Sequence, residues 1–167
     1  MMHRRRHGLA VTVIIIAASA FGACTSTALD TRPTIDAAAV VMPNAAITPG
    51  EVLSTNVNEI CISGYAKRTR DVSTATKNEV YAEYGITSHA PNQYEIDHLI
   101  PLGIGGANDI RNLWPQPTDP RPGRLEKDAL EDELHNRICD RSLDIRTAQQ
   151  AVATNWLAAY LKYVLHH

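Results

Sequence analysis

The residues best suited to chemistry in this chain lie between positions 94 and 135, and the most informative of them is the pair Asp97-His98. A neutral histidine has an ordinary pKa of about 6.5, so near neutral pH it accepts a proton from water. A neighbouring carboxylate binds a hard divalent cation through oxygen. An asparagine side chain, such as that of Asn112, orients an imidazole by hydrogen bonding. These residue types indicate metal-assisted activation of water.

The backbone around this pair must meet one geometric condition. Adjacent side chains of a regular strand point to opposite faces, so Asp97 and His98 enter one site only where the strand is bulged or ends. Pro101 and the glycines that follow it favour an end at this point. In the alternative interpretation, His98 is a hydrogen-bonded strand histidine and Asp97 is a surface acid.

Two further motifs follow the pair, Gly105-Gly106 and Asn112-Leu113. In order and spacing they resemble the HNH endonucleases, whose ββα-metal site begins with Asp-His on a strand and ends on a helix. An exported bacterial subgroup is most similar. It carries Cys-x-x-Gly-Tyr and Lys-Asp-x-Leu-Glu, found here as residues 61–65 and 127–131. The resemblance spans about residues 61–160.

The resemblance implies an α+β fold, in which a small ββα-metal core is flanked by helices. It also implies a metal-dependent endonuclease that hydrolyses phosphodiester bonds of DNA, with RNA as a second substrate. The implied roles are metal ligand for Asp97, general base for His98 and orienting residue for Asn112. The implied cofactor is a divalent ion, Mg²⁺ first, with Mn²⁺, Ni²⁺ and Zn²⁺ as alternatives.

The start of the following helix departs from the HNH pattern. HNH sites usually place His or Asn there as a second metal ligand, but residues 122–126 contain neither. The nearest residues able to bind a metal are Asp128 and His135, which we expect to complete the site. In the alternative interpretation they belong to a solvated helix face with local ion pairs, and metal binding depends mainly on Asp97.

Basic residues on either side of the pair are candidates for phosphate contacts. Lys67, Arg68 and Arg70 form a small cluster, and Arg124 and Lys127 begin the long helix. Phosphate contacts position a nucleic acid without reading its sequence. We expect Arg68, Arg70, Arg124 and Lys127 to make them, with a solvated face as the alternative for the cluster.

Hydrophobic periodicity and turn residues predict the elements that position these side chains. The expected elements are irregular structure over 52–63, a short helix over 78–84, a strand over 94–102, a Gly-rich loop over 103–108, an extended piece over 113–115, a Pro-rich turn over 119–123, and helices over 124–139 and 145–164. Leu130, Leu134 and Ile138 mark the apolar face of the first long helix.

The N-terminus has the pattern of a signal peptide over residues 1–23. Three arginines precede an apolar run from Leu9 to Phe21, and small residues precede Cys24. This run is shorter than the roughly 20 residues that span a membrane as a helix. We expect a lipoprotein signal with lipid on Cys24. Cleavage after Ala20 for ordinary secretion and an uncleaved anchor are the alternatives.

The remaining organisation follows from this export signal. Residues 24–50 are rich in Ala, Thr and Pro and are expected to form a flexible tether, with the nuclease-like domain over 51–167. Cys61 and Cys139 are then an even pair in an oxidising compartment, which predicts a disulfide, with two free thiols as the alternative. The protein is expected in the cell envelope or secreted, and on the membrane if Cys24 carries lipid.

Length and charge limit the function classes. The chain has 167 residues, enough for one domain, with 16 basic and 18 acidic residues. Removing residues 1–23 takes away three arginines and no acid, which leaves 13 against 18, or −5. An acidic domain is poorly suited to tight non-specific DNA binding. The competing hypotheses are an inactive HNH-like scaffold, serving as an envelope binding or structural lipoprotein, and a secreted toxin-like nuclease. No segment indicates a protein partner.

Overall fold

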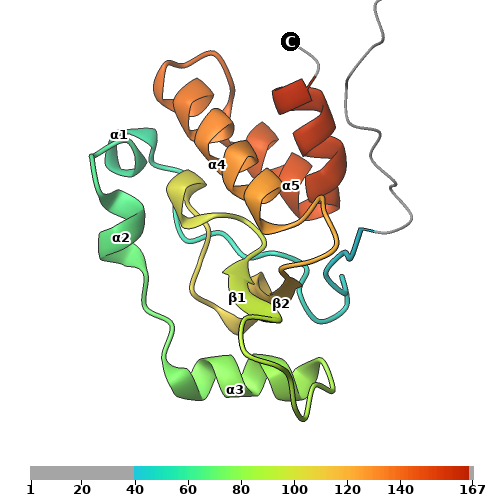
Figure 1. The fold of residues 1–167 in the computed structure, drawn as a ribbon. Helices are drawn as coiled ribbons and strands as arrows, with labels where there is room; N and C mark the ends of the chain where they lie inside the picture. The colour runs from blue at the N-terminus through green and yellow to red at the C-terminus, as the bar shows by residue number, and fades with distance from the viewer. Residues whose placement is uncertain (1–39, 166–167) are drawn as a thin grey trace, which may run out of the picture. The chain divides into compact units, whose positions relative to one another are not determined.

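The computed structural model describes residues 40–165, in which three helices precede a two-stranded sheet and two long helices follow it (Figure 1). The helices are α1 (Val57–Ile60), α2 (Tyr65–Thr69), α3 (Thr74–Glu83), α4 (Arg124–Cys139) and α5 (Ile145–Tyr160), and the strands are β1 (Tyr94–His98) and β2 (Leu113–Pro117). Single turns form η1 (Leu102–Ile104) and η2 (Ile110–Asn112), and the π-helical η3 (Leu161–Leu165) continues α5. The predicted α+β class is confirmed. Within residues 40–165, every helix is too short or too polar to cross a membrane.

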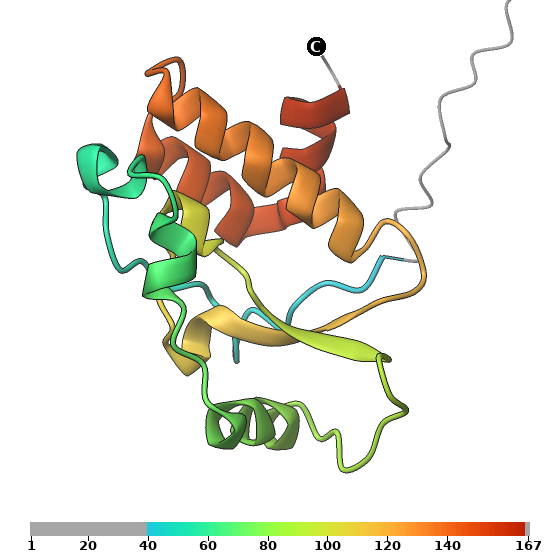
Figure 2. The ribbon, with the colours of Figure 1, turned by 60° about the vertical axis from the view of Figure 1, so that its left-hand side comes forward.

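The sheet is the antiparallel pair of β1 and β2. Its register pairs Asp97 with Trp114 and His98 with Leu113. Both strands lie where the sequence predicts extended structure, although β1 ends four residues earlier than expected. Figures 1 and 2 show α3 on one side of this pair and α4 and α5 on the other.

The main core lies between the sheet and the two long helices. Leu130, Leu134 and Ile138 are at most 1% exposed, so the predicted apolar face of α4 is buried, and α4 has the predicted bounds. Helix α5 differs from the prediction because Asn155 has non-helical angles (φ −166°, ψ 97°). Its Oδ1 accepts a hydrogen bond from the Ala158 N–H at 2.9 Å. Asn155 thus interrupts the helix and caps its continuation.

A smaller apolar cluster attaches α3 to the opposite side of the sheet. Val80, Ile96 and Leu113 form it and are at most 4% exposed. Helix α3 begins four residues before the predicted start because the Ser73 side chain accepts from the Thr76 N–H, which caps it. Gly85 follows its end with a φ of +69°, as a residue that stops a helix does.

A disulfide joins Cys61, just after α1, to Cys139 at the end of α4, with 5.6 Å between their Cα atoms. The predicted pairing is confirmed. The two cysteines are 78 residues apart. Closing a loop of that length removes entropy from the unfolded chain worth about 4.5 kcal/mol in the chain-entropy treatment.

The folded part begins earlier than the predicted boundary at residue 50. Thr48 is 1% exposed, and its hydroxyl donates to the Leu113 carbonyl at 2.9 Å. The Gly50 N–H donates to the Arg111 carbonyl at 3.0 Å. Residues 40–50 are therefore part of the folded domain, because these bonds hold them against β2 and the turn before β2. The predicted signal peptide, Cys24 and the first part of the tether lie outside the described residues.

Candidate functional site

Asp97 and His98 end β1 and line the same cavity of about 300 Å³. The register of β1 is continuous to His98, so the strand ends here without a bulge. The strand end that the sequence requires for a shared site is present. The other polar residues lining the cavity are Lys67, Arg70 and Glu131, from α2, the residue after it and α4.

Asn108 fixes the imidazole of His98. Its Nδ2 donates to the Thr69 carbonyl at 2.7 Å, and its Oδ1 accepts from the Asp71 N–H at 3.1 Å. The amide orientation is therefore determined, and Oδ1 faces His98 Nε2 at 3.0 Å as an acceptor. His98 consequently carries its proton on Nε2, which leaves the lone pair of Nδ1 as its proton acceptor when the ring is neutral.

Asn112 does not take the orienting role that the resemblance implies. It is fully buried, and its Oδ1 accepts from the Ile100 N–H at 2.9 Å. Its Nδ2 donates to the carbonyls of Ile100 (3.0 Å) and Ala107 (2.8 Å). These bonds close the Gly-rich loop. Gly106 is required there because a Cβ would lie 1.8 Å from the Ile100 oxygen. Asn112 thus shapes the loop that presents Asn108.

Lys127, which the sequence suggests as a contact for nucleic acid, is a buried residue beside Asp97 and His98. Only 2% of it is exposed. Its Nζ donates to Asp97 Oδ2 and to the His98 carbonyl, both at 2.6 Å. Gln116, with its amide oriented so that both ends have partners, donates to the same Asp97 oxygen at 3.0 Å.

Glu131 is a site residue to which the sequence alone assigns no role. It lies one helical turn after Lys127, and its Oε1 accepts from the Gly103 N–H at 3.2 Å. Burial raises the pKa of Glu131, the acids Asp97 and Asp128 raise it further, and the Lys127 ammonium opposes them. The motif Lys-Asp-x-Leu-Glu carried the signal, since residues four apart share a helix face.

Burial also lowers the pKa of His98 below its ordinary value. The hydrogen bond to Asn108 and the Asp97 carboxylate oppose this shift, while Arg70 and Lys127 add to it. The imidazole is therefore neutral near pH 7 and able to accept a proton.

The remaining basic residues divide between the cavity and the surface. Arg70 lines the cavity and donates to the Ile96 carbonyl at 3.4 Å. Arg68 instead donates to the Ser63 carbonyl at 2.7 Å, outside the cavity lining. Arg124 forms ion pairs with Glu95 (3.3 Å) and Asp128 (3.7 Å). Lys67 and Arg70 are thus the two cations in the cavity lining.

The implied divalent metal ion does not fit the donor set. Asp97 Oδ2 already receives two donors, and the side chain of Asp128 is 55% exposed and paired with Arg124. His135 lies away from both, with Nδ1 at 2.7 Å from the Gly103 carbonyl. Over residues 40–165, no three His, Cys, Asp or Glu side chains gather as a metal site would need. The three predicted metal ligands are therefore not brought together.

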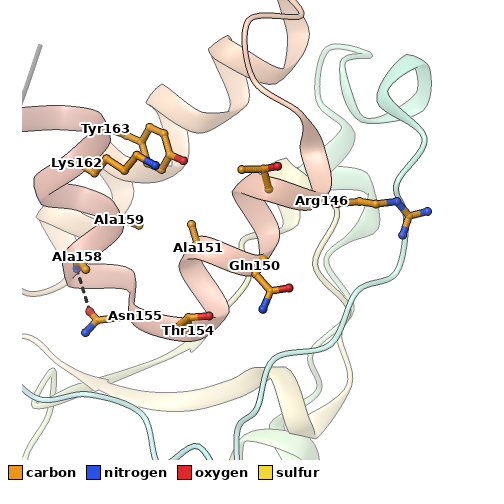
Figure 3. A pocket seen from close by; sticks show the side chains of 10 residues that line it. Arg146, Gln150, Ala151, Thr154, Asn155, Ala158, Ala159, Lys162 and Tyr163 are labelled. Carbon is orange, nitrogen blue, oxygen red and sulfur yellow. Dashed lines mark hydrogen bonds between the residues drawn. The ribbon is translucent and has the colours of Figure 1, made fainter.

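A larger hollow of about 550 Å³ lies along α5 and η3, away from this chemistry. Figure 3 shows Lys162 and Tyr163 on one side of it and Gln150 and Ala151 on the other. The residues lining it include Arg146 and Lys162 but no acid and no histidine. They supply no general base, so the cavity beside His98 is the candidate functional site.

The geometry of this cavity is the basis for a functional assignment, together with the motif resemblance. No protein-family profile, curated protein or solved structure matches the chain.

Proposed function

We propose that the protein is an endonuclease that hydrolyses phosphodiester bonds of DNA, and also of RNA, in the cavity beside His98. The observation that carries this proposal is the His98 ring. Its Nε2 is held by Asn108, which leaves Nδ1 as the acceptor, and the ring lines a cavity with two cations.

Each requirement of phosphodiester hydrolysis is met by a residue of this cavity. His98 Nδ1 takes a proton from the attacking water. Arg70 and Lys67 neutralise the phosphate, and a guanidinium does so with two parallel donors. Glu131 is the other carboxyl group in the cavity lining, so it is the residue that returns a proton to the leaving oxygen, in the minor protonated fraction that its raised pKa enlarges. Asp97 and Lys127 hold the strand end that presents His98.

The proposed setting is the cell envelope. The signal pattern over residues 1–23 and Cys24 supports a working domain outside the cytoplasm on a lipid anchor, and the disulfide between Cys61 and Cys139 agrees with an oxidising compartment.

A plasmid-nicking assay tests the proposal. The full chain is compared with His98→Ala and with His89→Ala, in Mg²⁺, Mn²⁺, Ni²⁺, Zn²⁺ or chelator. His98→Ala should lose at least about 100-fold in rate, the usual size of general-base catalysis. His89→Ala is the matched control, since His89 stacks on Tyr81 and does not line the cavity. Equal rates for wild type and His98→Ala in every condition would overturn the proposal.

A second candidate, an inactive HNH-like scaffold that binds a partner in the envelope, is favoured by one observation. The carboxylate that the resemblance makes a metal ligand is neutralised by Lys127. This candidate predicts no cleavage by the wild type with any of the four metals or with chelator. It also predicts that a purified protein with an intact disulfide is equally inert.

A further inference from the structure

We propose that the buried ammonium of Lys127 takes the place of the divalent cation in this site, so that the cavity works without a resident metal ion. This inference rests on the proposed nuclease function for its catalytic part. The replacement of a metal ion by the Lys127 ammonium is a property of the folded chain and is tested separately.

The ammonium occupies the position that a hard cation would take. Its two acceptors are a carboxylate oxygen of Asp97 and the backbone carbonyl of His98, each at 2.6 Å. Carboxylate and carbonyl oxygens are the ligands that Mg²⁺ and Ca²⁺ use. A lysine ammonium is a compact point charge, and with 2% exposure it is shielded from water.

The surrounding charges favour a cation at this position. Glu131 lies one helical turn after Lys127 and lines the same cavity as Asp97, so two carboxyl groups share one partly buried space. Without a positive charge beside them, these two acids would repel one another when ionised. Lys127 supplies that charge covalently, from the helix that follows the sheet.

A second cation is excluded by the same contacts. A divalent ion on Asp97 would compete with Lys127 and Gln116 for one oxygen and would lie beside the ammonium, which repels it. Arg70 adds a further positive charge along the cavity wall. Lys127 is therefore a positioning residue: it acts through Asp97 and the His98 backbone rather than on the substrate.

The first arm of the test measures plasmid nicking by the full chain in excess EDTA. We expect the wild-type rate to be the same with EDTA as with Mg²⁺, and His98→Ala to be inactive in both. Lys127→Gln keeps a donor for Asp97 but lacks the charge, and its nicking rate in EDTA should fall by about 10- to 100-fold, the usual effect of losing a residue that positions others. Lys77→Ala, an exposed lysine on α3, is the matched control. Loss of wild-type nicking in EDTA and its return with a divalent ion would overturn the inference.

The second arm measures Mn²⁺ binding by calorimetry and does not depend on catalysis. Wild type and Lys77→Ala should bind no Mn²⁺ in the millimolar range, whereas Lys127→Ala should acquire one site that Lys127→Ala/Asp97→Asn lacks. Removal of a lysine with only a structural role would not create that site. Because Lys127→Ala removes the charge partner of the partly buried Asp97 carboxylate, Lys127→Gln is the second variant if Lys127→Ala does not fold.

The two arms separate the two proposals. If the wild type never nicks DNA, the nuclease proposal fails and the Mn²⁺ titration alone decides the role of Lys127. If the wild type binds Mn²⁺ through Asp97, the proposal that Lys127 replaces a metal ion is overturned. It is also overturned if none of the proteins, including the Lys127 variants, binds Mn²⁺.

Discussion

A hydrogen bond from His98 Nε2 to the side-chain oxygen Oδ1 of Asn108 leaves Nδ1 as the one ring atom that accepts a proton. The bond depends on the Thr69 carbonyl and the Asp71 N–H, which fix the Asn108 amide from the far side. These two backbone groups thus determine the tautomer of the imidazole. The basicity of that ring is the property on which the proposed chemistry depends.

We predict that His98 titrates below the ordinary histidine pKa of about 6.5. Burial is the main cause; Arg70 and Lys127 act in the same direction, and Asp97 and Asn108 oppose it. An NMR titration of the imidazole Cε1–H signals measures the pKa directly. Asn108→Ala removes an interaction that raises the pKa, so its midpoint should be lower still. A wild-type midpoint at or above 6.5 would contradict the assigned environment.

On the scale of elements, α4 carries the charged half of the site. Lys127 and Glu131 are one turn apart. Lys127 contacts Asp97 on β1, and Glu131 accepts from the Gly103 N–H of η1. The other side of the helix is the buried face of Leu130, Leu134 and Ile138. The core packing of α4 therefore sets the position of Lys127 against the strand end.

We predict that Glu131→Gln stabilises the fold at pH 7.5 but not at pH 4. The pKa of Glu131 is raised in the fold, mainly by burial, so the native state holds that proton more tightly than the unfolded chain. The contribution of Glu131 to the free energy of unfolding is favourable below its unfolded pKa of about 4.5. That contribution is lost as pH rises through the folded pKa.

Urea unfolding of wild type and Glu131→Gln at both pH values measures this difference. Gln keeps an oxygen for the Gly103 N–H, so the variant isolates the charge. Asp132→Asn, one residue along the same helix, is a control for a general loss of negative charge. A difference in unfolding free energy that is as large at pH 4 as at pH 7.5 would contradict the prediction.

The elements were predictable because their signals are local. The apolar spacing of α4 and the breakers after β1 act over a few residues, although β1 ends before the predicted strand does and α2 was not predicted. The contacts of the site were not, because they join distant segments. Lys127 meets Asp97 only after α4 packs on the core, and Asn108 reaches His98 only after Asn112 has closed the Gly-rich loop. Residue type suggested Asn112 as the residue that orients the imidazole. In the structure Asn108, from the Gly-rich loop, makes that contact.

At the scale of the whole molecule, the charge at the cavity differs from that of the rest of the chain. The chain without residues 1–23 has a net charge of −5, yet Lys67, Arg70 and the buried Lys127 gather at one cavity. Such an arrangement supports a local phosphate contact more than extended binding along a duplex. A lipid anchor would raise the encounter rate with nucleic acid at the cell surface without requiring high affinity.

We predict that Cys24→Ser releases the protein from the membrane fraction. The proposed lipid attaches to Cys24, and acyl chains hold a protein on a bilayer through about 0.8 kcal/mol for each buried CH₂ group. Fractionation of cells expressing the full chain should therefore place wild type with membranes and Cys24→Ser in the soluble exported fraction. The disulfide between Cys61 and Cys139 should be intact in both, since either route passes through the oxidising compartment. Wild type and variant both soluble would indicate cleavage after Ala20, and both membrane-bound an uncleaved anchor; either result would overturn the lipoprotein assignment.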